Sequence, residues 1–154
     1  FGGPARVLSG RAGGLDVYLL EAEHLYARDG AIYLGPDGRD WPDNPERFAA
    51  LSWAAAALAA GGDAGWTPMV LHCHDWQAGL APYYLRHRFD AAVPSILTIH
   101  NMAFQGLAPG NRLAALRLDA RHFNRDGFEF WGQISALKAT PRVRALCTLA
   151  RASR

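Results

Sequence analysis

The fold is decided by one stretch, Leu71-His72-Cys73-His74-Asp75-Trp76-Gln77-Ala78-Gly79-Leu80, taken together with Thr98-Ile99-His100-Asn101. Each segment begins as an apolar run and ends in histidine and a polar residue, where a strand would pass into a loop or helix. In open α/β sheets, ligands bind just outside the carboxyl ends of the strands. Two imidazoles and a carboxylate at one edge of a sheet therefore predict a site for a polar small molecule.

The residues around this stretch predict a βαβ unit. The run 69–73 is predicted to be a strand that is apolar on both faces, as in a covered parallel sheet, and the run 95–99 is predicted to be another buried strand. Between them, Asp75 is placed to cap a helix over residues 76–88, in which Pro82 predicts a kink or a late start. A strand, a helix and a strand within about thirty residues form a right-handed unit. The predicted fold class is therefore α/β, a partial Rossmann-like parallel sheet with flanking helices.

Further elements are predicted on both sides of this unit. Residues 15–20 form a short β-prone run, and residues 103–133 form a long polar and aromatic loop with short helices. Asn44 and Pro45 are typical of the cap and first residue of a helix, and Gly61-Gly62 would end it. The apolar face of this helix is predicted to comprise Phe48, Leu51, Ser52, Ala55 and Leu58.

Composition limits the classes of protein that fit. The chain has 154 residues, of which 50% are hydrophobic, and this suits one domain with its own core. A net charge of +2 favours neither nucleic acid nor an acidic membrane surface as a partner, and no apolar run is long enough to cross a bilayer. The start, Phe1-Gly2-Gly3-Pro4, has no signal-peptide core, so we expect the middle of a longer protein. Cys73 is expected to be a buried thiol.

The histidine-rich segment leaves several interpretations open. His72 and His74 would share one face of a strand, as a metal pair would, but the third ligand of a catalytic zinc site is missing at the required spacing. We therefore predict no metal, and a metal hydrolase is the weaker alternative. In a purely structural alternative, His72 is buried while His74 and Asp75 cap the next helix. His100 and Asn101 could bind sugar hydroxyls, or Asn101 could merely shape a turn.

Aromatic residues in two predicted loops pose a similar choice. Residues 33–44 and 128–133 contain tyrosine, tryptophan and phenylalanine side chains that could stack on a sugar ring. Alternatively, Trp41 pins its own loop in place. Glu129 could act as an acid, but no second carboxylate can be placed opposite it, so a glycosidase pair is unsupported.

Together these segments resemble bacterial glycogen synthase and plant starch synthase, the ADP-glucose-dependent α-1,4-glucan synthases. The resemblance covers about residues 1–139 and includes no cofactor. Long blocks carry it in order, namely residues 33–44, 47–52, 72–82, 98–106 and 127–138.

The resemblance implies the N-terminal half of a GT-B glycosyltransferase. Such an enzyme transfers glucose from ADP-glucose to the non-reducing end of an α-1,4-glucan, with retention and without a metal. The resemblance assigns catalytic roles in the glucosyl pocket to Asp75 and His100. It assigns substrate contacts to four further residues, namely Asn101, Tyr33, His74 and Gln105. A cytoplasmic location in a bacterium, or a plastid in a plant, would follow.

Two departures from the family pattern matter. The phosphate-binding segment before Phe1 and the second domain are not in this chain, so we expect the isolated chain to be inactive. Residues 140–154 do not continue the family pattern, and we interpret them as an atypical tail from a frameshifted or truncated reading, which is disordered or loosely helical and dispensable. The alternative function is an inactive remnant, or a glucan-binding half-domain without transferase activity.

Overall fold

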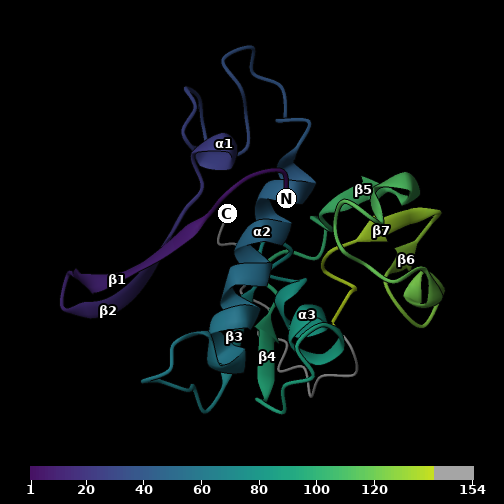
Figure 1. Ribbon diagram of the computed structural model, residues 1–154. Helices are drawn as coiled ribbons and strands as arrows, with labels where there is room; N and C mark the ends of the chain where they lie inside the picture. Colours follow the sequence, from purple (N-terminus) through teal and green to yellow (C-terminus); the bar gives the residue numbers. More distant parts are fainter. Residues whose placement is uncertain (141–154) are drawn as a thin grey trace.

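The computed structural model describes residues 1–140, which are arranged around one central helix, α2 (Asn44–Ala57) (Figure 1). An extended hairpin lies on one side of α2, and a small antiparallel sheet lies on the other. The parallel strands β3 (Leu71–His74) and β4 (Ser95–Thr98) lie near its C-terminal end, beside α3 (Ala81–His87). The predictions for the tail, apart from Thr140, fall outside the described residues.

The predicted βαβ unit is confirmed. β3 and β4 pair in parallel, with Leu71 opposite Ser95 and His74 opposite Thr98. The connecting helix starts late, at Ala81, because Pro82 is accommodated only in the first turn of a helix. Cys73 is buried on β3, as predicted, and burial raises the pKa of its thiol to about 12.

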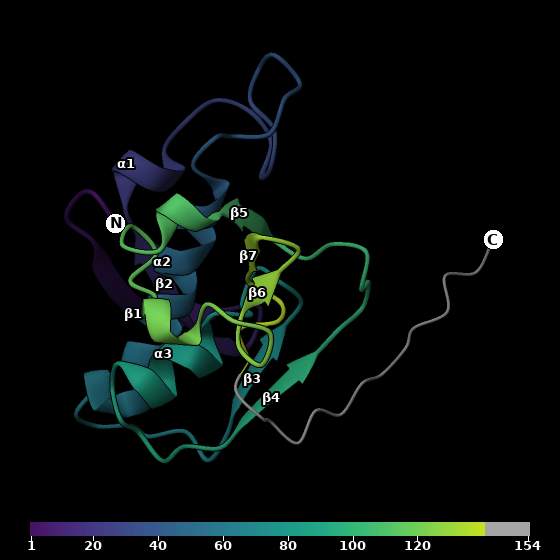
Figure 2. The ribbon, with the colours of Figure 1, turned by 90° about the vertical axis from the view of Figure 1, so that its right-hand side faces the viewer.

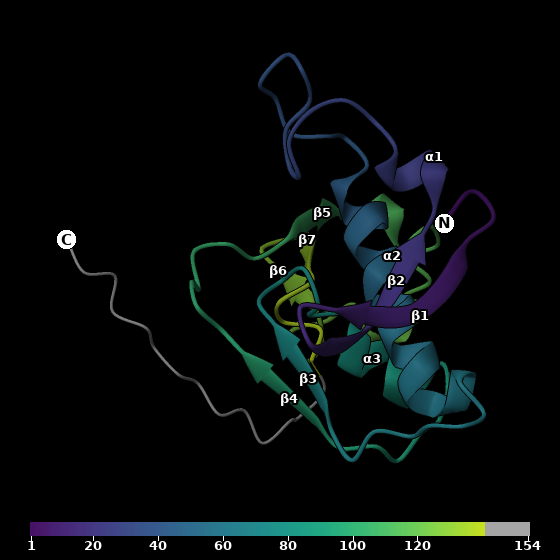
Figure 3. The ribbon, with the colours of Figure 1, turned by 90° about the vertical axis from the view of Figure 1, so that its left-hand side faces the viewer.

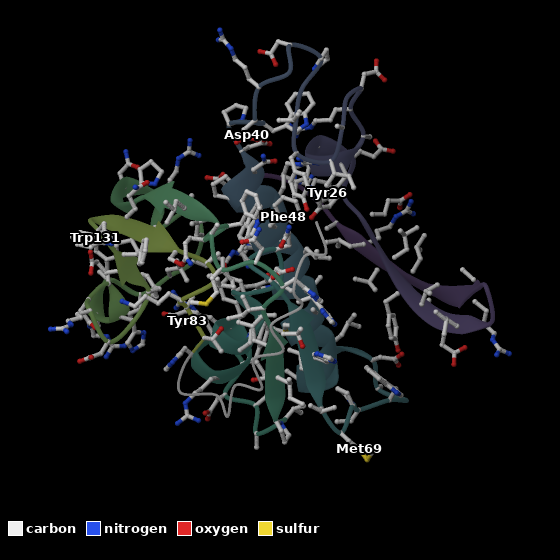
Figure 4. All side chains as sticks on the ribbon, turned by 180° about the vertical axis from the view of Figure 1, so that it is seen from behind. Tyr26, Asp40, Phe48, Met69, Tyr83 and Trp131 are labelled. Atoms are coloured by element: carbon white, nitrogen blue, oxygen red, sulfur yellow. The ribbon has the colours of Figure 1, made fainter. Side chains whose placement is uncertain are left out.

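The burial of the two faces of β3 differs from the prediction. The strand begins at Leu71 and alternates between exposed and buried positions, so it is not apolar on both faces. Met69 precedes the strand and is 92% exposed, at the periphery of the molecule (Figure 4). A continuous apolar run does not by itself show that both faces of a strand are covered.

The helix α2 is confirmed, but its buried face was predicted only in part: Ser52 is buried, whereas Leu51 is not. The helix begins at Asn44, and Asp43 occupies the N-cap position without a side-chain cap. Leu51 is 42% exposed, whereas the residues facing the core are small. They include Ala49, Ala50, Ser52 and Ala56. Short side chains let the bulky Tyr84 of α3 pack closely against α2.

The end of α2 agrees with the prediction from its glycines. A single π-helical turn, η1 (Leu58–Gly62), follows the helix directly. Gly61 adopts φ +99°, a conformation that glycine tolerates best, and the helical path ends there.

The predicted strand at residues 15–20 is confirmed as β2 (Leu15–Glu21). Its partner, β1 (Arg6–Ala12), was not predicted. The two strands form an antiparallel hairpin across Gly13-Gly14, and both of these glycines have positive φ, as a type I′ turn requires. Figure 3 shows the hairpin passing in front of α2 and leading to the short helix α1 (Glu23–Tyr26).

Residues 103–133 contain more regular structure than predicted. The expected short helices are present as the 3₁₀ turns η2 (Gly110–Arg112) and η3 (Ala120–His122). The prediction missed three short strands, which form an antiparallel sheet in the order β5-β7-β6. Their bounds are Leu107–Pro109 for β5, Glu129–Phe130 for β6 and Gln133–Ser135 for β7. This sheet contributes Ile134 to the main core, beside the buried Phe128.

Candidate functional site

Four of the six predicted site residues meet at the carboxyl ends of β3 and β4. His74 is the last residue of β3, and Asp75 follows it directly. β4 ends at Thr98, after which the chain swings outward in a wide loop before β5 (Figure 2). Because β3 and β4 run parallel, their carboxyl ends lie at the same edge, and His100 and Asn101 come next to the end of β3. The edge formed by these four residues is called the rim below.

Asp75 organises the rim, but not in the way the sequence suggested. Its backbone has φ +52°, a strained conformation that aspartate adopts more readily than most residues. Its amide donates to the Thr98 carbonyl at 2.9 Å, which continues the ladder between the two strands. Its Oδ1 accepts the amide of His100 at 2.7 Å and that of Asn101 at 3.5 Å. The carboxylate therefore fixes the loop that carries both residues.

The prediction that Asp75 caps the following helix is wrong. α3 begins at Ala81, Leu80 occupies the cap position, and the helix has no side-chain cap. The structural alternative for the histidines is also wrong, because His72 is exposed and its Nε2 hydrogen-bonds the Thr98 hydroxyl at 2.8 Å. A local sequence signal for a cap cannot distinguish a bond to the next helix from a bond to the neighbouring strand.

Three imidazoles line up along the rim. The rings of His72 and His74 lie with centroids 4.4 Å apart, as expected for side chains on one face of a strand. His74 Nδ1 lies 3.1 Å from His100 Nε2, so the two rings share one hydrogen bond, which joins the end of β3 to the loop after β4. Among residues 1–140, no three histidine, cysteine or acidic side chains are placed together as a metal site would require.

Asn101 and Gln105 both stabilise the loop that follows β4. Asn101 Oδ1 accepts the amide of Ala103 at 2.9 Å, which is the turn-shaping role left open by the sequence. Gln105 donates to the Met102 carbonyl at 2.6 Å and accepts the Ser135 hydroxyl at 2.9 Å. These bonds tie the loop to β7 as well as to its own backbone.

Tyr33 contacts the two residues that follow Asp75 in sequence. Its ring packs on Trp76 and on Phe48, with centroids 6.1 and 5.6 Å away. Its hydroxyl accepts a hydrogen bond from Gln77 Nε2 at 2.6 Å. Asn44 Nδ2 donates to the Tyr33 carbonyl at 2.9 Å. Tyr33 is thus joined to Asp75 through the two residues next to it in sequence.

Sequence reasoning missed Arg47, which anchors the loop that carries Tyr33. Its guanidinium is buried and donates to the carbonyls of Leu25 at 2.9 Å and Ile32 at 2.8 Å, and to Asn44 Oδ1 at 2.7 Å. Burial lowers the pKa of Arg47 from its ordinary value. A charged residue three positions after Asn44 on the buried side of a helix was the available signal. It went unused because arginine on a helix is usually solvated.

The other aromatic and acidic candidates have structural roles. Trp41 donates to the Ala31 carbonyl at 3.2 Å and stacks beneath the guanidinium of Arg28, so it pins its own loop. Glu129 Oε1 accepts the amide of Gly132 at 2.7 Å and closes the turn between β6 and β7. Trp131 at that turn is 87% exposed.

Known proteins share both the sequence and the arrangement of this chain. Residues 3–148 match the starch synthase catalytic domain family. The chain belongs to this family. It is 63% identical over 139 residues to the glycogen synthase of Paracoccus denitrificans and 58% identical over 139 residues to that of Roseobacter denitrificans. Each comparison covers 90% of this chain, which spans 30% and 29% of those relatives.

A solved member of the family has the same fold. The catalytic domain of starch synthase IV from Arabidopsis thaliana, bound to ADP and acarbose, aligns with a TM-score of 0.66 at 22% identity. The alignment covers 88% of this chain and 28% of that one. The predicted α/β, GT-B-related fold class is therefore confirmed for this part of the domain. No helix among the described residues is long and apolar enough to span a membrane.

Proposed function

We propose that this chain forms the acceptor-side wall of a retaining glucosyltransferase that extends an α-1,4-glucan from ADP-glucose. The observation that supports the proposal most is the rim, where Asp75, His74, His100 and Asn101 converge at the carboxyl ends of two parallel strands. Such an edge is where open α/β sheets bind ligands. The two bacterial relatives are named glycogen synthases, and we place this enzyme in a bacterial cytoplasm rather than a plastid.

In this reaction the protein would position the sugar and would not form a covalent bond to it. The bond between glucose C1 and the diphosphate breaks, the bond from C1 to the acceptor 4-oxygen forms on the same face, and the hydroxyl proton leaves with ADP. Charge that develops at the ring is stabilised by polar groups held in place beforehand. We assign catalytic roles to His100 and Asp75. The Asp75 carboxylate accepts the His100 amide at 2.7 Å and so fixes the loop that carries His100.

The remaining site residues would bind or orient substrate. Asn101 and Gln105 lie in the loop after β4, and their bonds to backbone and to Ser135 hold that loop in one shape. Tyr33 would contact substrate from the loop before α2. We keep residues 1–139 as the family segment and residues 140–154 as an atypical tail, with the second wall of the cleft contributed by the rest of a complete enzyme.

A chimera tests this function directly. The matched segment of this chain replaces its 63% identical counterpart in the Paracoccus denitrificans glycogen synthase. We expect the chimera to incorporate glucose from ADP-glucose into glycogen, and the isolated 154-residue chain to incorporate none, because one wall cannot stabilise a two-sided transition state. Incorporation by the isolated chain, or an inactive chimera that is folded by circular dichroism, would contradict the proposal.

A further inference from the structure

The contact between His74 and His100 has a geometry that specifies how the two rings interact. Their planes are inclined by only 14°, and their centroids are 5.4 Å apart, while His74 Nδ1 and His100 Nε2 are 3.1 Å apart. Each nitrogen lies about half a ring width from the centroid of its own ring, so the centroids can be farther apart than the nitrogens by at most about one ring width. The observed difference between the two distances equals this maximum. The two nitrogens therefore lie on the line between the ring centres. The rings meet edge to edge in a common plane, as an in-line N–H···N hydrogen bond requires.

Only one proton can lie between these nitrogens, and its position sets the tautomer of both rings. A neutral imidazole has one donor and one acceptor nitrogen. If His100 donates from Nε2, both rings carry their proton on Nε2, which is the form that a free neutral imidazole prefers. If His74 donates from Nδ1, both rings must take the less favoured form. The first arrangement is therefore the more stable one.

We propose that His74 is a positioning residue, which holds His100 with its proton on Nε2 and leaves His100 Nδ1 as an acceptor for a hydroxyl of the transferred glucose. The part of this inference that concerns glucose rests on the function proposed above. The structure holds both partners in place. Asp75 Oδ1 accepts the His100 amide at 2.7 Å, and the His72 ring lies 4.4 Å from the His74 ring, centroid to centroid. His74 thus acts on the sugar only through His100.

Nuclear magnetic resonance of the complete 154-residue chain tests the hydrogen bond without any assay of activity. Histidine is labelled with ¹⁵N, and spectra are recorded at a pH well above the ordinary histidine pKa. We expect the His100 proton on Nε2, with a nitrogen–nitrogen coupling across the bond to His74 Nδ1. A His100 proton on Nδ1, or rapid averaging between both tautomers without a coupling, would overturn the inference.

Paired variants of His74 in the chimera test the consequence for the reaction. The amide oxygen of asparagine can occupy the place of Nδ1, whereas that of glutamine reaches the place of Nε2. We expect His74→Asn to keep kcat within about twofold, and His74→Gln to lower it by about tenfold with little change in KM, the value of one hydrogen bond. Equal kcat values for the two variants, or a loss confined to KM, would contradict the positioning role.

The two measurements separate this inference from the proposed function. An unmodified chimera that makes no glucan contradicts the proposed function, whereas the coupling between His74 and His100 is still measured in the isolated chain. An active chimera together with an absent coupling overturns the positioning role alone.

Discussion

The β3–β4 pair and the β1–β2 hairpin are both two-stranded sheets, but only the first is packed into a core. Leu97 on β4 is 3% exposed and lies in a cluster with Cys73, whereas Leu19 on β2 is 60% exposed. Backbone pairing alone gives a marginal structure in water, and packing against other elements supplies the rest. The rim can therefore hold its side chains at hydrogen-bond distances, because its strands are packed. The hairpin has no such constraint along β1, where every residue is exposed.

The same substitution made in both sheets tests this difference in packing. We expect Leu97→Ala to lower the free energy of unfolding by about 3 kcal/mol, because it leaves a cavity beneath the rim. Leu19→Ala should cost about 0.5 kcal/mol or less, since that side chain is already in water. Urea denaturation followed by circular dichroism measures both values. Similar losses in the two variants would mean that the hairpin is as tightly packed as the parallel pair.

A second pair compares a buried arginine with an exposed one. Arg47→Met should cost about 2 kcal/mol, because it leaves the buried Leu25 carbonyl and Asn44 Oδ1 without their donor. Arg6 forms an ion pair with Glu21 on the hairpin, with 74% of the Arg6 side chain exposed, so Arg6→Met should change the stability by about 0.5 kcal/mol or less. The same denaturation experiment applies. A loss in Arg6→Met equal to that in Arg47→Met would contradict the difference in packing.

The smallest expected effect is a pH dependence that comes from Cys73 beneath the rim. Burial raises the pKa of this thiol to about 12, so the folded state keeps a proton that the unfolded chain releases above its ordinary thiol pKa. Stability should therefore fall as the pH rises from about 8.5 towards 10, by about 1 kcal/mol more in the original chain than in Cys73→Ala. Unfolding free energies at the two pH values provide the measurement. Parallel pH profiles would indicate that the thiol is accessible to water.

The sequence predicted the elements that local patterns define. The parallel strands, the late start of α3 at Pro82 and the end of α2 at Gly61 all follow from side-chain pattern and backbone restriction. The partner strand β1 was missed, because a strand with a central glycine and exposed side chains has no apolar alternation to detect. Leu51 was assigned to the core because periodicity cannot show which face the tyrosines of α3 will cover.

The site was predicted as a set of residues, but their mutual contacts were not. The carboxyl-end rule brought Asp75 and His100 to one edge, and the structure confirms that placement. The bond from the Asp75 carboxylate to the loop after β4, and the bond between His74 and His100, join residues that are far apart in sequence. Such contacts depend on the strand register, which a single sequence specifies only through the packing of one face.

The central claim is that the rim contacts the glucose being transferred, and the kinetics of one variant test it most directly. In the chimera, His100→Ala should lower kcat on the order of a hundredfold and leave KM for glucan nearly unchanged, as expected for a contact that matters in the transition state. The matched control is His24→Ala, which removes an exposed histidine on α1 whose Nε2 lies 3.1 Å from the Phe1 carbonyl oxygen. The control should retain the kcat of the unmodified chimera. A His100→Ala chimera with an unchanged kcat and only a raised KM would contradict the assignment of the rim as the glucosyl-transfer wall.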